Sequence, residues 1–552
     1  MKKTLDFVKE GSLDPFYNRL FDEVATESIP RFNQWINEIN HNFKGEASWM
    51  FSSPSSRNPY SSRLFYQFCC LELLMKIDLS EIDRILVYGK AMELEVNKIL
   101  VEKNTTCHVI NKHISISSKI SVKLNNFINI SDAIVKFILP FICSLFFKKK
   151  YNIKEPIILI DTFVGPGFVD KDRYYEGLIE NISNAQDQCY FAPQYTGYSG
   201  LKGYWDLISE TRKSKRNFIL KEDFISLMMI VRIIFSTIRN KHNLKLIMHS
   251  NYVSLISEAM TNVDSIYSIF IAKSNYLFFQ QMKEQRYECK TIINWAENQQ
   301  IDKGWNKGAN TYFPEAKKRG YKGALDCDLY LCFQPIESEV EYGYTPNEYF
   351  VLGKNSAEKS YYQELNLVSH LAPAFRYQSM IDKTSKTLHK TNDSIMLCLP
   401  IGETPASNIL SLTIPILNEF NGKVFIKRHP VGPSQNWLID NSKVQPNHNI
   451  EWVDGDFHSL LEQVSIFVGS SSSTCFDAVL MQKSVIIVST SGFSYNYIPN
   501  DINASYYNWV YSSNEFKESL QSLIQNKPKL EKVNIDDYFS PVNTELCESL
   551  IS

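Results

Sequence analysis

The residue types best suited to chemistry lie in two short segments of the C-terminal third, "KVFIKRHP" (423–430) and "IFVGSSSSTCFD" (466–477). The first is an apolar run that ends in Lys-Arg-His, and Pro430 stops the strand because proline cannot donate to a sheet. Alternation along a strand places Lys427 and His429 on the same face. A cation and an imidazole are therefore expected at one sheet edge.

The second segment places a row of hydroxyls directly after an apolar run. With a strand at 465–469 and a helix from about 475, the row becomes a strand-to-helix turn, with Thr474 as the N-cap and Asp477 completing a capping box. Hydroxyls and free N–H groups at a helix start favour an anion such as phosphate. The alternative is a purely structural turn. The donor-binding candidates here are Ser470, Ser471, Ser472, Ser473 and Thr474.

Both segments belong to a repeated pattern of short apolar runs and helical stretches between 394 and 535, which indicates a Rossmann-like unit of about 150 residues. The expected strands are 394–400, 423–430, 450–454, 465–469 and 484–488, with helices at 407–420 and 456–464. In parallel sheets, ligands bind beyond the carboxyl ends of the strands. Glu403 follows the first of these strands. Its carboxylate is expected either to reach a ribose hydroxyl of a bound nucleotide or only to compensate the positive charge at a helix N-terminus.

A second domain of the same α/β class is expected over residues 1–380, because 552 residues exceed one ordinary hydrophobic core. A polar stretch at 379–393 is the predicted linker, and residues 536–552 form a C-terminal tail. The expected strands of the first domain are 84–89, 107–111, 156–161, 245–250 and 290–296, and a helix is expected at 91–103. Two such domains would face each other across a central cleft.

"KRHP" followed by "GSSSSTCFDAVLMQKSVIIV" resembles the HP and SS motifs of GT-B glycosyltransferases that use cytidine-activated donors, such as bacterial sialyltransferases and Kdo transferases, and of the related CDP-glycerol phosphotransferases. The resemblance covers mainly residues 394–490. It implies that the histidine and the serines hold the donor phosphate and nucleotide. The chain departs from the CDP-polyol pattern at Val468 and Gly469, where that pattern has an acidic or aromatic residue, and it lacks the acidic-acidic-glycine motif of sialyltransferases.

Glycosyl transfer of this kind also needs a carboxylate from the opposite domain, acting as a base or as a nucleophile. Glu297 follows the strand 290–296 and ranks first, because "ENQ" also resembles an "ExQ" segment of surface-glycan transferases. Asp161, at the expected end of the strand 156–161, ranks second. Each has the alternative of a solvated loop acid. The acceptor-binding candidates are Arg173, Tyr174, Gln299 and Trp305, and His249 is a weaker site candidate.

Composition limits the other function classes. The net charge of −2 gives no reason to expect a nucleic-acid partner. Eleven cysteines without a CxxC pair suit reduced thiols in the cytoplasm rather than a metal site or a disulfide framework. No metal or other cofactor is expected, because histidine and serine can hold the phosphate. The N-terminus lacks the apolar core of a secretory signal.

Two apolar segments, 130–150 and 224–239, raise the question of membrane contact. The first carries Asp132, Lys136 and Pro140 and falls short of a spanning helix, which needs about 20 apolar residues. Each is either a core helix or an interfacial helix on anionic lipid, and the core alternative has more weight. Peripheral contact with the inner membrane therefore stays an expectation beside a cytoplasmic location.

The resulting hypothesis is a GT-B glycosyltransferase that moves Kdo or a sialic-acid-like nonulosonate from a CMP-activated donor to a surface polysaccharide or lipopolysaccharide. The rivals among enzymes are a CDP-glycerol or CDP-ribitol phosphotransferase, an NDP-hexose transferase and a UDP-sugar 2-epimerase. A rival of another class is a non-catalytic nucleotide-binding scaffold of a glycan assembly complex.

Overall fold

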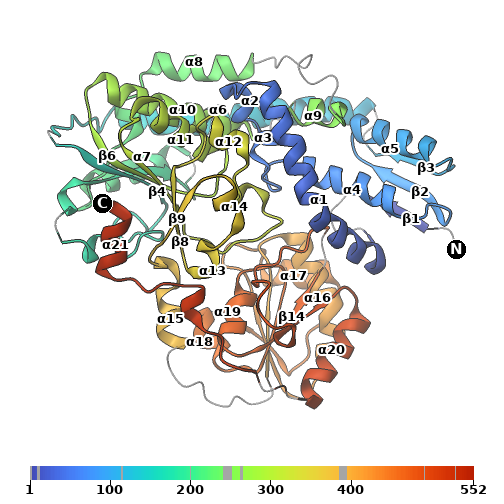
Figure 1. Ribbon diagram of the computed structural model, residues 1–552. Helices are drawn as coiled ribbons and strands as arrows, with labels where there is room; N and C mark the ends of the chain where they lie inside the picture. The colour runs from blue at the N-terminus through green and yellow to red at the C-terminus, as the bar shows by residue number, and fades with distance from the viewer. Residues whose placement is uncertain are drawn as a thin grey trace.

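The computed structural model (Figure 1) describes most of the chain, in three sheets made only of parallel strands. The described residues are 3–8, 13–112, 116–153, 155–183, 185–198, 200–239, 251–260, 265–384, 394–489, 492–526, 528 and 530–552. Two sheets have six strands and one has three. Because parallel strands need crossover connections, helices separate the strands along most of the chain.

The C-terminal domain is a six-stranded sheet in the order β12-β11-β10-β13-β14-β15. Its strands are β10 (Ser394–Cys398), β11 (Lys423–Lys427), β12 (Ile450–Val453), β13 (Ile466–Gly469), β14 (Ser484–Val488) and β15 (Tyr507–Val510), and its helices are α16 (Glu403–Leu417), α17 (Gln435–Ser442), α18 (Phe457–Leu461), α19 (Thr474–Leu480) and α20 (Ser513–Asn526). In this doubly wound order the first and fourth strands, here β10 and β13, lie side by side at the centre. The sheet is built outward from them in opposite directions. The expected Rossmann-like domain is confirmed.

The N-terminal domain contains the other six-stranded sheet, in the order β5-β4-β6-β7-β8-β9. Its strands are β4 (Ile157–Val164), β5 (Cys189–Tyr195), β6 (Cys289–Trp295), β7 (Lys317–Lys322), β8 (Glu348–Val351) and β9 (Val368–Leu371). Its principal helices are α6 (Ile116–Ser144), α7 (Gly200–Lys213), α8 (Leu227–Ile238), α10 (Ile266–Glu284), α11 (Gln300–Tyr312), α12 (Glu337–Glu341) and α15 (Gln378–Thr384). The second strand in sequence lies outside the first, which is again a Rossmann-like order.

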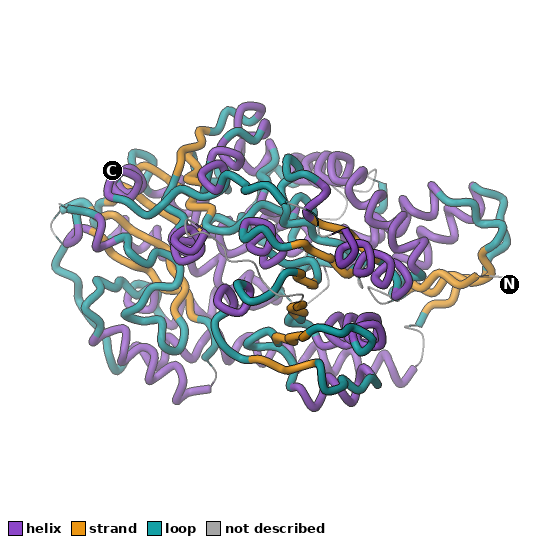
Figure 2. The backbone as a smooth tube through the Cα atoms, turned by 90° about the horizontal axis from the view of Figure 1, so that it is seen from below, coloured by secondary structure: helices purple, strands orange, loops and turns teal. Residues whose placement is uncertain are grey.

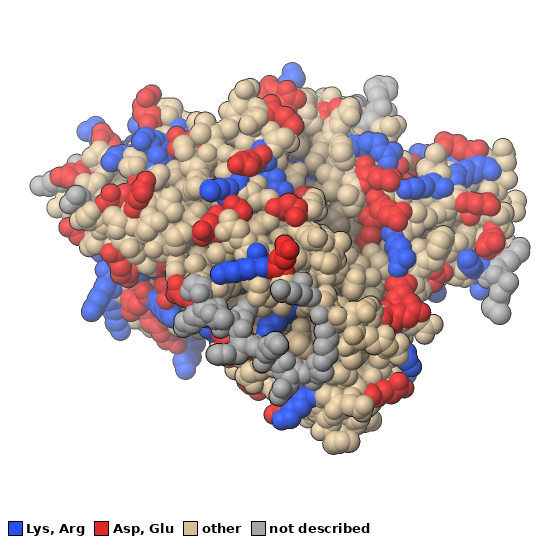
Figure 3. Space-filling model, turned by 60° about the horizontal axis from the view of Figure 1, so that its bottom comes forward, with Lys and Arg blue, Asp and Glu red and all other residues tan. Residues whose placement is uncertain are grey.

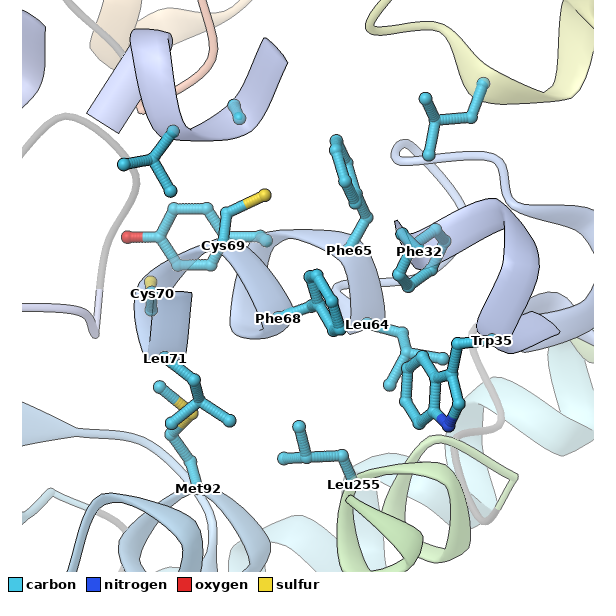
Figure 4. Close-up of a cluster of buried hydrophobic side chains, with 14 of the residues drawn as sticks. Phe32, Trp35, Leu64, Phe65, Phe68, Cys69, Cys70, Leu71, Met92 and Leu255 are labelled. Carbon is cyan, nitrogen blue, oxygen red and sulfur yellow. The ribbon is translucent and has the colours of Figure 1, made fainter. Parts of the chain in front are cut away.

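The strands expected at 84–89 and 107–111 do not join that sheet. They are β2 (Ile82–Val87) and β3 (His108–Asn111), which pair with β1 (Lys3–Asp6) in a three-stranded sheet of their own at one end of the molecule (Figure 2). The helices of this subdomain are α1 (Pro15–Asn42), α4 (Leu64–Lys76), α5 (Lys90–Glu102) and α9 (Val253–Met260). A small sheet cannot bury its own faces, so a core rich in aromatic residues between these helices supports it (Figure 4).

Several expected boundaries are wrong. The strand expected to end at Asp161 continues to Val164, and the helix expected from 407 begins at Glu403, just after β10. Strand 245–250, with His249, lies outside the described residues, as does most of the predicted linker, 385–393.

The C-terminal tail returns to the N-terminal domain, so the chain passes between the domains twice. Helix α21 (Thr544–Ile551) buries Cys547, Leu550 and Ile551 in the core beside β6 and β7. Arg319 of β7 donates to the carbonyl oxygens of Ser549 and Leu550, at 2.9 and 3.0 Å. A cation therefore satisfies the free carbonyls at the helix end.

We expect Leu550→Ala to destabilise the protein by about 2–5 kcal/mol, because it removes a fully buried side chain and leaves a cavity. The matched control is Glu545→Ala, on the exposed face of the same helix. Thermal unfolding followed by calorimetry measures both. Equal melting temperatures for the two variants would contradict the docked position of α21.

Candidate functional site

The two motifs come together at one edge of the C-terminal sheet. β11 and β13 both pair with β10, and Cys398 of β10 lies opposite Lys427 while Leu397 lies opposite Val468. The loops that follow β11 and β13 therefore leave the same edge, about two strand spacings or roughly 10 Å apart. The serine row follows β13 at the point where the strand order reverses, which is where ligands bind in such sheets.

The serine turn has free donors, but its capping differs from the expectation. Ser473 is the N-cap of α19 and makes no side-chain cap, while Thr474 is the first helical residue and donates to Ser472 Oγ at 3.0 Å. Asp477 turns instead toward His458, 3.6 Å away, so the expected capping box is absent. The N–H groups of Ser471 to Ser473 make no hydrogen bond to any described residue. They are half-buried and available to an anion.

His429 is held in one tautomer by its own loop. The backbone N–H of Val431 donates to His429 Nδ1 at 3.3 Å, so the neutral ring carries its proton on Nε2. Partial burial and the guanidinium of Arg173 lower the pKa of this imidazole below its ordinary value. Near neutral pH His429 is thus a neutral ring whose Nε2–H can donate to a phosphate oxygen.

The other donor-side candidates have less direct positions. Lys427 donates to the carbonyl of Gly455 at 2.7 Å, which ties β11 to the loop after β12. Glu403 is exposed in the first turn of α16, as both of its alternatives require. Neither position by itself assigns a ligand.

The two domains face each other through the loops that carry these candidates. Arg173, from the loop after β4, lies close enough to His429 to depress its pKa. Tyr497, from the loop after β14, lies within electrostatic reach of Glu297: burial, the main cause, and that carboxylate both raise the pKa of its phenol. Arg173 was expected on the acceptor side, and it lies within electrostatic range of the donor-side histidine.

Glu297 is half-buried at the end of β6 and held by two donors. Trp295 Nε1 donates to Glu297 Oε1 at 2.8 Å, and the side-chain amide of Gln299 donates to Oε2. Gln299 also donates to the Tyr330 hydroxyl at 3.0 Å. These two hydrogen bonds fix the orientation of the Glu297 carboxylate. Gln299, which was expected as an acceptor-binding residue, therefore also orients Glu297.

A strained residue and a buried ion cluster support this loop. Asn298 has a positive φ of 54°, which is uncommon outside glycine, and donates to Glu339 Oε2 at 2.9 Å. Arg57 and Lys303 form ion pairs with the same carboxylate at 2.9 and 2.8 Å, and all three charged side chains are fully buried. Although burial favours the neutral acid, the two cations lower the pKa of Glu339.

Arg376 is a residue that the sequence did not indicate. It follows the short strand β9, and its guanidinium lies over the rings of Tyr174 and Trp295, with centroids 5.8 and 5.7 Å away. A cavity of about 820 Å³ opens here, lined by Arg376 and Arg173 together with Phe168 and Phe375. Tyr174 contacts Trp295 edge-to-face at 4.5 Å, and Trp295 in turn donates to Glu297. β9 is short and only half-buried, which removes the periodic signal that would reveal it.

Two predicted site residues are buried within their elements. Asp161 lies within β4, 2% exposed, beside Lys221, and burial raises its pKa to about 7 while Lys221 and Gln194 act in the other direction. Trp305 is 0% exposed on α11 and packs edge-to-face on Phe279, so it cannot stack on a sugar. Both signals came from residue type, which does not reveal the face of an element.

Within the described residues, no group of three or more His, Cys, Asp or Glu side chains is arranged to hold a metal ion. The cysteines are free thiols. Lys and Arg are interspersed with Asp and Glu on the face shown in Figure 3.

No protein-family model and no curated protein sequence matches the chain. Among solved structures it is similar to the S. aureus MnaA–UDP co-structure, with 13% identity over 71% of this chain and 94% of that chain and a TM-score of 0.39. It is similar to CalG4, the calicheamicin glycosyltransferase, with 10% identity, coverage of 67% and 90%, and a TM-score of 0.38. For the Neisseria meningitidis UDP-GlcNAc 2-epimerase bound to UDP-GlcNAc, the values are 12%, 72%, 98% and 0.38. The strand orders of the two sheets show an α/β fold with two Rossmann-like domains, independently of these similarities.

Asp161→Asn should leave nucleotide binding unchanged and alter the pH dependence of stability. Between about pH 4 and 7 the folded state keeps a proton that the unfolded state has lost, so the stability contributed by this group falls as pH rises. In the variant, the decrease in stability that Asp161 causes between about pH 4 and 7 should be absent. Melting temperatures between pH 4 and 8 measure the effect, with the exposed Asp440→Asn as control. Loss of nucleotide binding would contradict a purely structural role.

Proposed function

We propose that the protein is a glycosyltransferase that binds a nucleotide-sugar between its two domains. The observation that carries the proposal is that His429 and the free N–H groups of the serine turn lie at one edge of the C-terminal sheet, with Arg173 of the other domain within electrostatic range of His429. A guanidinium, an imidazole N–H and backbone N–H groups are all donors that a phosphate group can use. Glu297 supplies a held carboxylate from the opposite domain.

In the proposed reaction the bond between the anomeric carbon and the donor phosphate breaks, and its electron pair stays on the phosphate oxygen. His429, Arg173 and the serine turn stabilise that charge, which does not require a metal ion. The acceptor hydroxyl bonds to the anomeric carbon, and Glu297 takes its proton, with inversion. If Glu297 instead attacks the anomeric carbon first, a covalent adduct forms and the product retains its configuration.

For the donor, we propose a CMP-activated sugar of the Kdo or nonulosonate type. Support comes from the resemblance of "KRHP" and "GSSSST" to motifs of cytidine-dependent transferases. The proposed acceptor is a growing surface polysaccharide or lipopolysaccharide, reached at the cytoplasmic face of the inner membrane.

We expect His429→Ala to weaken nucleotide binding about 10- to 100-fold, because it removes a hydrogen bond to a charged group. The exposed His448→Ala in the same domain is the matched control.

Glu297→Gln should lower kcat about 10²- to 10⁴-fold while nucleotide affinity stays within about threefold. Its control is the exposed Glu315→Gln. Calorimetry and transfer assays measure these effects; a Glu297→Gln protein with full glycan output would favour the non-catalytic scaffold.

Calorimetric titration with CMP, CDP, UDP and dTDP should rank the cytidine nucleotides first. CMP is the expected tightest ligand, because it is the product of a CMP-sugar donor. Tighter binding of CDP would favour a polyol phosphotransferase. If UDP or dTDP binds and neither cytidine nucleotide does, the cytidine donor is wrong, whereas the glycosyl-transfer proposal then depends on the Glu297 result.

A further inference from the structure

Helix α8 presents an apolar stripe to solvent. Ile230 and Ile233 pack inward on the core shared with α10, and they are 2% exposed. The outward side chains are Leu227, Met228, Val231, Phe235 and Ile238, which are 50%, 71%, 51%, 60% and 49% exposed. At 100° per residue these five fall within an arc of about 100°. A helix that is apolar on its inner and outer sides is incompletely covered by the part of the chain that the structure describes.

Helix α6 has the same character. Its segment Asn125–Ser144 is long and apolar enough to cross a membrane by length and composition. Ala133, Phe137 and Phe141, however, are buried against the core of α10, so one face of the helix belongs to the fold and it does not span. The outward apolar side chains are Phe127, Ile128, Val135, Ile142, Leu145 and Phe146, which are 38% to 70% exposed.

Cations and an aromatic anchor border these two stripes. Lys148, Lys149 and Lys150 are exposed just beyond α6, and Arg232 and Arg239 flank the stripe of α8. Trp205 of α7 is 39% exposed and contacts Phe146, with ring centroids 5.2 Å apart. Exposed acids also lie on these helices: Asp132 on α6, which pairs with Lys136 at 2.7 Å, and Asp206 on α7. Exposed apolar residues with a basic border and a tryptophan are typical of a membrane interface.

We propose that the outward faces of α6 and α8, termed here the α6–α8 surface, dock on a bilayer that contains anionic lipid. In a symmetric pair of chains, each basic border would meet its own copy and repel it. Anionic headgroups complement that border instead. Figure 1 shows α8 at the end of the N-terminal domain farthest from the C-terminal domain, so docking leaves the domain interface open. The proposal goes beyond sugar transfer, because it requires no nucleotide.

Co-sedimentation with vesicles of phosphatidylcholine, with and without phosphatidylglycerol, tests the proposal on the full chain. The wild type should bind the anionic vesicles more tightly, and high salt should weaken that binding. Val231→Asp combined with Phe235→Asp should lower binding at least about tenfold. Replacing Lys148, Lys149 and Lys150 by serine should lower it about fivefold per charge.

The matched control is Leu94→Asp combined with Val101→Asp on α5, two side chains that are 50% and 76% exposed elsewhere on the molecule. This pair should leave vesicle binding unchanged. The melting temperature of each variant, measured by calorimetry, verifies the fold without reference to a nucleotide, so failure of docking stays distinct from failure of the proposed donor site. Equal vesicle binding by the wild type and the α8 variant overturns the proposal. So does a dimer, seen by analytical ultracentrifugation, that the α8 substitutions dissociate.

Discussion

The candidate site depends on the ion pairs and the hydrogen bond that the buried carboxylate of Glu339 forms. This carboxylate pairs with Arg57 from the N-terminal helical subdomain and with Lys303 from α11, and it accepts from Asn298 in the loop that carries Glu297. Removing one member of such a buried cluster leaves an uncompensated charge, at a cost of about 3–5 kcal/mol. The cluster therefore couples the position of the catalytic candidate to the packing of a subdomain that carries none of the proposed site residues.

The candidate site is built from residues of both domains. The C-terminal domain supplies donors for an anion, in the serine turn and in His429, whereas the N-terminal domain supplies an oriented carboxylate and two arginines. Arg173 belongs to the N-terminal domain, yet it acts on His429. Any change in the angle between the domains alters the distance between Arg173 and His429, so anion binding and domain closure are expected to be coupled.

Much of the C-terminal domain was predictable, because β10, β13 and β14 are buried apolar runs bounded by polar turns. β7 was not, since "KKRGYK" is a largely buried strand rich in cations, and a partner such as the tail, which Arg319 contacts, is distant in sequence. The pattern of apolar runs in the sequence placed His429 and Glu297 at strand ends. It did not show that the side chains of Asp161 and Trp305 are buried. The face of an element depends on its neighbours in space, which one sequence does not specify.

The docked helix α21 also constrains the order of folding. Residues 544–551 complete the core of the N-terminal domain, yet the ribosome makes them after the whole C-terminal domain. During synthesis the C-terminal sheet can therefore close beside a neighbour whose apolar surface at β6 and β7 is still uncovered. Growing chains expose that surface until residues 544–551 have left the ribosome, and exposed apolar surface of this kind makes folding intermediates prone to aggregation.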